Sequence, residues 1–218
     1  MSAVTDISDR LAACYTGVIH DVMRARGLRD FALPPELRPI LPDQAMAGPA
    51  FTIAGEVVAD ADPHETLLAW TGLLSKAPAG SIWVSQPNDR VVAHMGELSA
   101  ETLKNKGVRG CVTDGYIRDA NFLMAIGFQA WCRGFTPLDI VGYWLPKATD
   151  VPVIIGAVTI APGDYLVGDR DGLIRVPRAE VSTIVEQAEV AIATESLVRK
   201  AILEGSDPQE AYLKFGKF

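Results

Sequence analysis

The sequence predicts a single α/β domain with a mixed sheet, and three observations support this fold class. Short apolar runs alternate with helix-like segments through the middle of the chain, as in strands and helices that pack in layers. The last third contains several short strand-like runs joined by glycine and aspartate turns. The chain of 218 residues is long enough for one well-filled core but not clearly for two, so we expect one domain over residues 1–218.

Glycine, proline and helix-capping residues mark the expected elements in the first half of the chain. Gly27 is the predicted stop of the first helix, and Asp62-Pro63 precedes the second. From the N-terminus we expect a helix over 8–26 that could break near Thr16-Gly17, an extended proline-rich connection over 33–49, a strand over 50–59, a helix over 64–76, and strands over 81–85 and 90–95.

The second half continues the alternation and then becomes rich in strands. We expect a helix over 97–106, a strand over 110–113, a helix over 118–126, strands over 128–132, 151–160, 165–167 and 173–176, a long helix from Pro177 to about Leu203, and a short helix that starts after Asp207-Pro208 and ends before Gly216. The segment 169–172 resembles part of a calcium loop but lacks the distal glutamate, so a hairpin turn is the better interpretation.

Composition and charge exclude several classes of protein. The net charge of -7 argues against non-specific binding to nucleic acid and against adhesion to an anionic membrane. The N-terminus has acidic residues where a signal peptide needs a basic start, and no uncharged apolar run approaches the ~20 residues of a membrane span. Three widely spaced cysteines suit a reducing compartment. We therefore expect a cytoplasmic protein without a nucleic-acid or membrane partner.

The candidate chemistry lies at Gly96-Glu97-Leu98-Ser99 and at Arg118-Asp119. Gly96 follows an expected strand and precedes an expected helix, so the amides that follow it should be unpaired donors that suit a carboxylate or phosphate. Arg118 can bind a carboxylate through two hydrogen bonds or stabilise developing negative charge. Asp119 is a hard oxygen ligand of the kind that Mg²⁺ prefers.

The residues alone also allow a structural interpretation. An Arg-Asp pair at a helix start is often a surface cap or an exposed ion pair, and Gly96 is commonly only a turn. His94 could contact the site, although a core histidine is the alternative, and His64 is a weaker candidate for substrate contact. Nucleotide-binding glycine motifs and a serine-hydrolase elbow are absent from the sequence, and the lysines fall in expected helices, turns or the tail, which disfavours a Schiff-base aldolase.

An ordered set of motifs resembles the RraA-like family, which includes the 4-hydroxy-4-methyl-2-oxoglutarate/4-carboxy-4-hydroxy-2-oxoadipate aldolases. The resemblance rests on Gly-Glu-Leu at 96–98, on Gly-Val-Arg-Gly-Cys-Val-Thr-Asp-Gly at 107–115, on Arg118-Asp119, and on similar segments at 16–22, 161–169 and 171–177. It implies a three-layer α/β/β sandwich of the swivelling-domain type that forms trimers or hexamers. It further implies active sites between subunits, with the C-terminal helices over 177–216 packed on a neighbouring subunit.

The resemblance also implies a role for each site residue. Arg118 would bind the substrate carboxylate and stabilise an enolate, and Asp119 would ligate Mg²⁺ or Mn²⁺ directly. The amides of Gly96 to Ser99 would hold the pyruvyl carboxylate, while Glu97 would act through metal-bound water. Glu195 of a neighbouring subunit would also reach the metal through water. Ser99 stands where a more apolar residue is typical of the family. The resemblance therefore defines the pyruvyl end of the substrate but not the group at its other end.

The implied activity is a metal-dependent aldolase that cleaves a 4-hydroxy-2-oxo acid to pyruvate through an enolate. Oxaloacetate decarboxylation would accompany it, because it passes through the same enolate. Two alternatives remain: a non-catalytic regulator that binds ribonuclease E, as in other members of the family, or a lyase for another oxo acid, such as one derived from a sugar.

Overall fold

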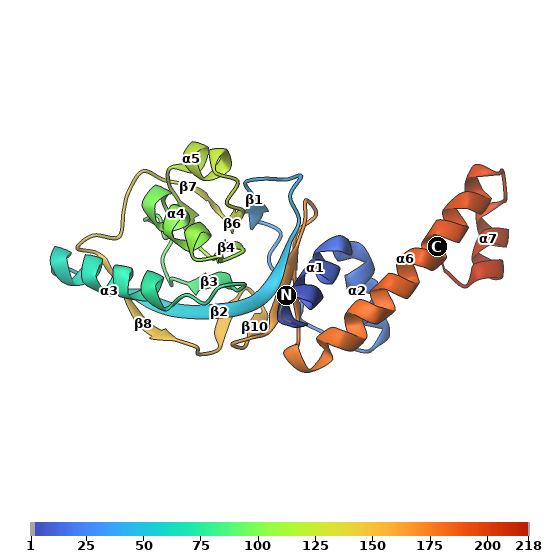
Figure 1. The fold of residues 1–218 in the computed structure, drawn as a ribbon, viewed down its shortest axis with the longest axis horizontal. Coiled ribbons are helices and arrows are strands. Elements are labelled where there is room, and N and C mark those ends of the chain that lie inside the picture. Colours follow the sequence, from blue (N-terminus) through green and yellow to red (C-terminus); the bar gives the residue numbers. More distant parts are fainter. Residues whose placement is uncertain (1–2, 218) are drawn as a thin grey trace.

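A computed structural model describes residues 3–217 as a curled mixed sheet with helices on both sides (Figure 1). The helices are α1 (Ala3–Ala13), α2 (Thr16–Ala25), α3 (Pro63–Lys76), α4 (Glu97–Asn105), α5 (Ala120–Ala125), α6 (Val181–Leu203) and α7 (Pro208–Phe215), with a short 3-10 helix η1 (Arg178–Glu180). The strands are β1 (Arg38–Pro39), β2 (Met46–Val57), β3 (Ile82–Gln86), β4 (Gly110–Thr113), β5 (Tyr116–Ile117), β6 (Ala130–Cys132), β7 (Gly134–Phe135), β8 (Trp144–Thr149), β9 (Val153–Ile155), β10 (Val158–Ile160), β11 (Tyr165–Gly168) and β12 (Leu173–Val176).

The main sheet combines a parallel centre with antiparallel edges. Its order is β1-β6-β4-β3-β2-β11-β12, and β8 is an additional strand that pairs with β2. Strands β2, β3, β4 and β6 run parallel, whereas β1, β8, β11 and β12 pair antiparallel with their neighbours. The long strand β2 spans both regions, since its first residues pair with β11 and its last residues with β8. The predicted α/β fold with a mixed sheet is confirmed.

Alternating side chains of the central strands bury the two faces of the sheet in different layers. Trp83 and Cys111 face a core built with α3, α4 and α5. Ile82 and Val112, their chain neighbours, face the opposite way and pack against β9 and β10. Helices α3–α5, the main sheet and the β9–β10 hairpin therefore form the three layers of an α/β/β sandwich. A third core joins β11 and β12 to α1, α2 and α6.

Most predicted elements are confirmed, including the break near Thr16, the stop at Gly27 and the terminal helix before Gly216. Gly27 and Gly216 both have positive φ, which suits a helix C-terminus. The segment 169–172 is the turn between β11 and β12, so the hairpin interpretation is also confirmed.

Three expectations about the strands and one about a helix are wrong, and four strands were not predicted. Residues 90–95 form a loop with one isolated bridge at Ala93, and not a strand. The predicted strand over 151–160 is the hairpin β9–β10, which turns at Gly156 with φ +63°. Strand β2 begins at Met46 within the expected connection. The short strands β1, β5 and β7 and the longer β8 were not predicted. Helix α5 begins at Ala120 and not at Arg118, because the preceding residue is left-handed.

The three cysteines are free thiols, all buried. Cys111 and Cys132 lie on the adjacent strands β4 and β6 in the core beneath the helices. Burial raises the pKa of the Cys132 thiol to about 11 and also raises the pKa of Cys111. Within the described residues, no helix combines the length and the apolar character that crossing a membrane requires.

Candidate functional site

The start of α4 provides free backbone donors. Gly96 precedes the helix in an extended conformation, and the Glu97 N–H donates to Oδ2 of Asp119 at 3.0 Å. Among the described residues, the N–H groups of Leu98 and Ser99 have no protein acceptor. The exposed α4 N-terminus can therefore bind an anionic group, as the sequence predicts.

Arg118 and Asp119 lie directly against this helix start. Nε of Arg118 is 3.4 Å from Oδ2 of Asp119, and NH1 of Arg118 donates to Oδ2 of Asp139 at 3.2 Å. All three side chains are between 38% and 44% exposed, so a ligand can reach them. Asp119 has φ 55° and ψ 33°, a left-handed conformation that Asp and Asn tolerate better than most residues.

Backbone pairing between two loops brings these residues together. Ala93 forms a parallel bridge with Tyr116, and the His94 N–H donates to the Tyr116 carbonyl at 2.8 Å. The Arg118 N–H then donates to the Met95 carbonyl at 2.9 Å. The residues that precede α4 and those that precede α5 therefore run side by side and end at the same point.

Gly96 is required for space and not for its backbone angles. Its φ of -153° is ordinary extended backbone. A Cβ at this position would lie 2.9 Å from Oδ2 of Asp119 and 3.1 Å from Cγ of Arg118. Only a glycine lets the Arg-Asp pair approach the helix start this closely.

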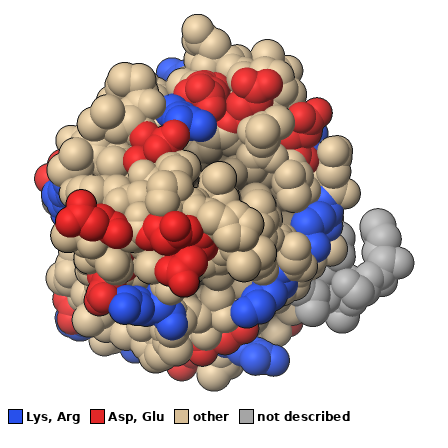
Figure 2. Space-filling model, turned by 90° about the vertical axis from the view of Figure 1, so that its left-hand side faces the viewer, with Lys and Arg blue, Asp and Glu red and all other residues tan. Residues whose placement is uncertain are grey.

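These groups line a cleft of about 480 Å³ between α3, α4 and the loop 139–141. Its walls are formed by residues of these segments and of the loops that precede α4 and α5: Leu67, Trp70, Thr71, Leu74, Ala93, Met95, Gly96, Glu97, Leu98, Ser99, Thr102, Arg118, Asp119, Asp139, Ile140 and Val141. Figure 2 views the molecule from the α3–α4 end and shows red and blue atoms close together around a hollow, with uncharged surface between them.

The donor set suits a hard cation held mainly by water. Among the described residues, no group of three or more His, Cys, Asp or Glu side chains is placed to hold a metal ion. Asp119 nevertheless has one carboxylate oxygen, Oδ1, without a hydrogen bond in the described chain. The carboxylate of Glu97, on the first turn of α4, also lacks an ion pair there. One or two carboxylates with several waters is the arrangement that Mg²⁺ commonly adopts.

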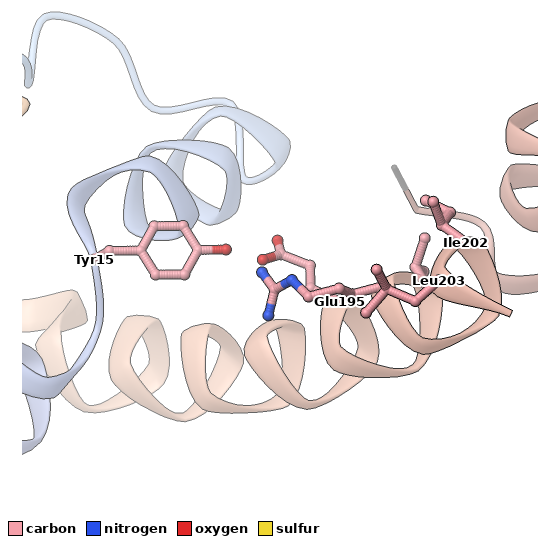
Figure 3. Close-up of a pocket in the computed structure, with 6 residues that line it drawn as sticks. Tyr15, Glu195, Ile202 and Leu203 are labelled. Carbon is pink, nitrogen blue, oxygen red and sulfur yellow. The ribbon is translucent and has the colours of Figure 1, made fainter.

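Glu195 lies elsewhere in the molecule. Its carboxylate pairs with Nζ of Lys217 at 2.8 Å, and α6 runs at the end of the molecule opposite α3 and α4 (Figure 1). It borders a separate groove of about 390 Å³, where the side chains of Tyr15 and Glu195 point toward one another (Figure 3). One chain therefore does not bring Glu195 to Asp119, and its role at a neighbouring subunit's site stays a prediction.

His94 is a buried core residue beneath the site. Its Nε2 is 2.9 Å from Oδ2 of Asp89, and both side chains are at most 2% exposed. Because a carboxylate can only accept, Nε2 carries the proton, and the buried Nδ1 has no partner in the described chain. Burial lowers the pKa of His94, and the hydrogen bond and charge of Asp89 offset only part of this effect. His64 does not line the cleft.

Two contacts at the site were not predicted from the sequence. Asp139 holds Arg118, but it lies in an irregular loop after β7 and no motif marks it. The Ser99 hydroxyl accepts a hydrogen bond from Nε1 of Trp70 at 2.9 Å. This bond connects α4 to α3 and accounts for a polar residue at a position where an apolar one was expected.

Comparison with known proteins shows similarity in sequence and in fold. The profile of one protein family, described as RraA-like (Aldolase/RraA), matches residues 5–175. A Halalkalibacterium halodurans protein named "Putative 4-hydroxy-4-methyl-2-oxoglutarate aldolase" is 29% identical over 178 residues, which are 82% of this chain and 81% of that protein.

Solved structures share the fold. RraAS2 of Streptomyces coelicolor, described as an unusual member of the RNase ES inhibitor RraA protein family, is 28% identical with a TM-score of 0.79 and covers 89% of this chain and 96% of its own. An uncharacterized protein from Pseudomonas syringae is 24% identical with a TM-score of 0.86 and covers 98% of this chain and 96% of its own.

Proposed function

Because the chain belongs to the RraA-like family, we propose that it is a carbon–carbon lyase that releases pyruvate from 4-hydroxy-2-oxo acids. Oxaloacetate decarboxylation is proposed as a companion activity. The observation that carries the proposal is the position of Arg118 and Asp119 against the N-terminus of α4, where the amides are free. Asp119 accepts a hydrogen bond there, and Gly96 leaves room for both residues because it has no side chain. The name of the Halalkalibacterium halodurans relative supports the same class of reaction.

Each residue of the cleft has a task in this reaction. The amides of Leu98 and Ser99 bind the substrate carboxylate, as a helix N-terminus does. Glu97, acting through water, accepts the proton of the C4 hydroxyl as the bond between C3 and C4 breaks. Arg118 stabilises the negative charge that develops on the pyruvate enolate, and Asp139 holds the guanidinium in place. Protonation at C3 then gives pyruvate.

We also propose Mg²⁺ or Mn²⁺ as the cofactor, bound directly by Asp119 and through water by Glu97. When bound, the ion would act as a Lewis acid on the keto oxygen of the substrate. Glu195 of a neighbouring subunit is proposed to complete the water-mediated contacts.

The test is pyruvate release from oxaloacetate and from 4-hydroxy-4-methyl-2-oxoglutarate with Mg²⁺, with Mn²⁺ and with excess EDTA. We expect release that depends on the metal and falls by at least about 100-fold in Asp119→Asn, the size of effect seen when one charge-stabilising group is removed. Asparagine tolerates the left-handed backbone of residue 119, so a loss would reflect the missing charge. Full metal-dependent turnover in this variant would refute the site.

Similarity to RraAS2 supports a second candidate function, binding to a ribonuclease of the RNase E type. A purified ribonuclease that binds the chain, together with no pyruvate release from any oxo acid, would favour this candidate over the lyase.

A further inference from the structure

A largely buried ion pair joins the two chain segments that lead to Arg118 and Asp139. Asp114 directly follows β4, and Arg133 directly follows β6. Nε and Nη2 of Arg133 lie 2.7 and 2.6 Å from Oδ1 of Asp114, so two N–H groups donate to one carboxylate oxygen. The two side chains are only 13% and 16% exposed, and solvent therefore screens this pair much less than an exposed one.

The strands that follow this ion pair, β5 and β7, form a very short parallel pairing. Each strand contributes two residues. The Arg133 N–H donates to the Gly115 carbonyl at 2.9 Å just before the pairing, and the Thr136 N–H donates to the Ile117 carbonyl at 3.1 Å just after it. A two-stranded pairing is marginal by itself even when it is longer. Contacts at its two ends therefore decide how firmly β5 and β7 hold together.

Ion pairs lie at both ends of this short pairing. Asp114 and Arg133 precede β5 and β7, whereas Arg118 directly follows β5 and Asp139 lies in the loop after β7. NH1 of Arg118 is 3.2 Å from Oδ2 of Asp139, and these two side chains are 40% and 44% exposed. The less exposed pair therefore fixes one end of the two segments, and the other end carries the pair at the cleft.

Strand β5 also contacts the loop before α4 on its other side. The His94 N–H donates to the Tyr116 carbonyl at 2.8 Å, and the Arg118 N–H donates to the Met95 carbonyl at 2.9 Å. A Cβ on Gly115 would lie 2.9 Å from Cδ2 of His94, so the two segments are in close contact. Because β5 lies between this loop and β7, a shift of β7 changes how Arg118 sits at the start of α4.

We propose that Asp114 and Arg133 are positioning residues that set where the Arg118 guanidinium lies at the α4 N-terminus; this rests on the proposed function. Their ion pair holds β5 against β7, and β7 leads to Asp139, which holds Arg118 in turn. Neither Asp114 nor Arg133 is among the residues that line the cleft, so both act through Arg118.

Arg133→Lys tests the proposal in the full chain, with Mg²⁺ and with oxaloacetate or 4-hydroxy-4-methyl-2-oxoglutarate as substrate. Lysine keeps the positive charge but lacks the fixed, planar set of donors of a guanidinium. We expect kcat for pyruvate release to fall about tenfold, because small displacements of a catalytic group have large effects on rate. KM should change by less than about twofold, since the amides of Leu98 and Ser99 bind the substrate carboxylate without the ion pair.

Arg175→Lys is the matched control. Nε of Arg175 is 2.7 Å from Oδ2 of Asp164, and the side chains are 23% and 6% exposed. Arg175 lies on β12, which is far from β6 in the order of the main sheet. This variant should lower the melting temperature without lowering kcat. An unchanged kcat in Arg133→Lys, or the same fall in both variants, would overturn the proposal.

A double-mutant cycle with Arg118→Gln tests whether the ion pair acts through Arg118. The losses of kcat should not multiply, because a misplaced guanidinium has no further effect once the guanidinium is removed. We therefore expect the variant with both substitutions to have nearly the same kcat as Arg118→Gln alone. Losses that multiply would show that Arg133 acts independently of Arg118, and they would also overturn the proposal.

Hydrogen exchange of the Arg118 amide separates this proposal from the proposed function, because it needs no substrate. The amide is bonded to the Met95 carbonyl, and its exchange should be about tenfold faster in Arg133→Lys but unchanged in Arg175→Lys. If the wild-type chain releases no pyruvate from any oxo acid, the lyase is refuted, and the exchange rates alone decide whether the ion pair positions Arg118. Equal exchange in the wild-type chain and Arg133→Lys would refute the positioning role, whatever the activity.

Discussion

At the residue scale, Gly96 controls how close Arg118 and Asp119 come to the start of α4. Alanine can adopt its extended backbone, but the added Cβ would press on both side chains, 2.9 Å from the Asp119 carboxylate. The effect of the substitution should therefore fall on the site and not on the fold.

We predict that Gly96→Ala lowers kcat/KM for pyruvate release by about tenfold or more, because displacements of about 1 Å in a catalytic group have large effects on rate. The melting temperature should change little. Gly72→Ala is the control, since a Cβ there meets nothing within 4 Å, and it should leave activity unchanged while raising stability by up to about 1 kcal/mol. Full activity in Gly96→Ala would contradict the proposed geometry.

His94 and Asp89 make the fold sensitive to acid. The pKa of His94 is lowered, chiefly by burial, so the unfolded chain takes up a proton near pH 6.5 that the folded chain resists. Burial alone would raise the pKa of Asp89, but hydrogen bonds from the Val92 and Val91 amides and from His94 outweigh it and lower the pKa. The stability that each group contributes is present above its unfolded pKa and is lost as the pH falls.

We predict that the free energy of unfolding decreases between about pH 7 and pH 5, and that His94→Gln makes this decrease shallower. The variant should also lose about 1–3 kcal/mol at pH 8, because it disturbs a buried hydrogen bond. Tyr143→Phe removes another hydrogen bond to Asp89 without removing the titrating imidazole, so it should keep the wild-type slope. Urea titrations across this range measure the slope, and an unaltered slope in His94→Gln would be inconsistent with the assignment.

The sequence could predict those site residues that lie at the boundaries of helices and strands. Gly96, Glu97, Arg118 and Asp119 lie at the ends of predicted elements, and the structure brings them into one cleft. Asp139 could not be predicted, because its contact with Arg118 depends on the path of an irregular loop. No local pattern could show that His94 would be buried against Asp89 either.

At the scale of elements, the hairpin turn between β11 and β12 caps a helix distant in the sequence. Oδ2 of Asp169 accepts from the Thr16 N–H at 2.7 Å, and Oδ1 accepts from the Thr16 hydroxyl at 2.8 Å. The cap joins the start of α2 to the sheet.

We predict that Asp169→Ala lowers the free energy of unfolding by about 1–2 kcal/mol, the usual effect of losing a helix cap. Asp171→Ala in the same turn should change it by less than about 0.5 kcal/mol, because Asp171 is exposed and its carboxylate makes no hydrogen bond in the described chain. Chemical denaturation distinguishes them. Equal effects would mean that the turn itself, and not the cap, determines stability.

Elements with strong boundary residues were predictable, whereas those that depend on distant partners were not. Helices α3 and α7 begin at Asp-Pro pairs whose carboxylates accept backbone hydrogen bonds. Strand β8 contains Pro146 and the exposed Lys147, and it exists because β2 extends far enough to pair with it. Residues 90–95 have an apolar strand-like pattern, but they form only an isolated bridge at Ala93 and a few backbone hydrogen bonds to neighbouring loops, and not a continuous strand pairing.

At the scale of the whole molecule, α6 and α7 project from the body (Figure 1). Both helices carry exposed apolar side chains. Leu203 and Leu213 are 81% and 74% exposed, and Val190 and Leu197 are also largely exposed. Such a surface favours association.

We predict that the chain forms trimers or hexamers through α6 and α7, as measured by sedimentation. Combining Leu203→Glu with Leu213→Glu should shift the population toward monomers, while Gln209→Glu, at an exposed polar position on α7, should not. An unchanged sedimentation coefficient in the double variant would exclude this surface as the interface.

Because every cysteine is buried, alkylation of the thiols reports local unfolding of the chain. A thiol with a raised pKa inside the core has almost no thiolate to react, so alkylating reagents should leave the native protein unmodified. Each excursion that separates α3–α5 from the sheet would expose Cys111 and Cys132 to attack. The rate at which iodoacetamide modifies Cys111 and Cys132, separated from Cys14 by peptide mass mapping, would therefore measure these openings without a dye or an engineered label.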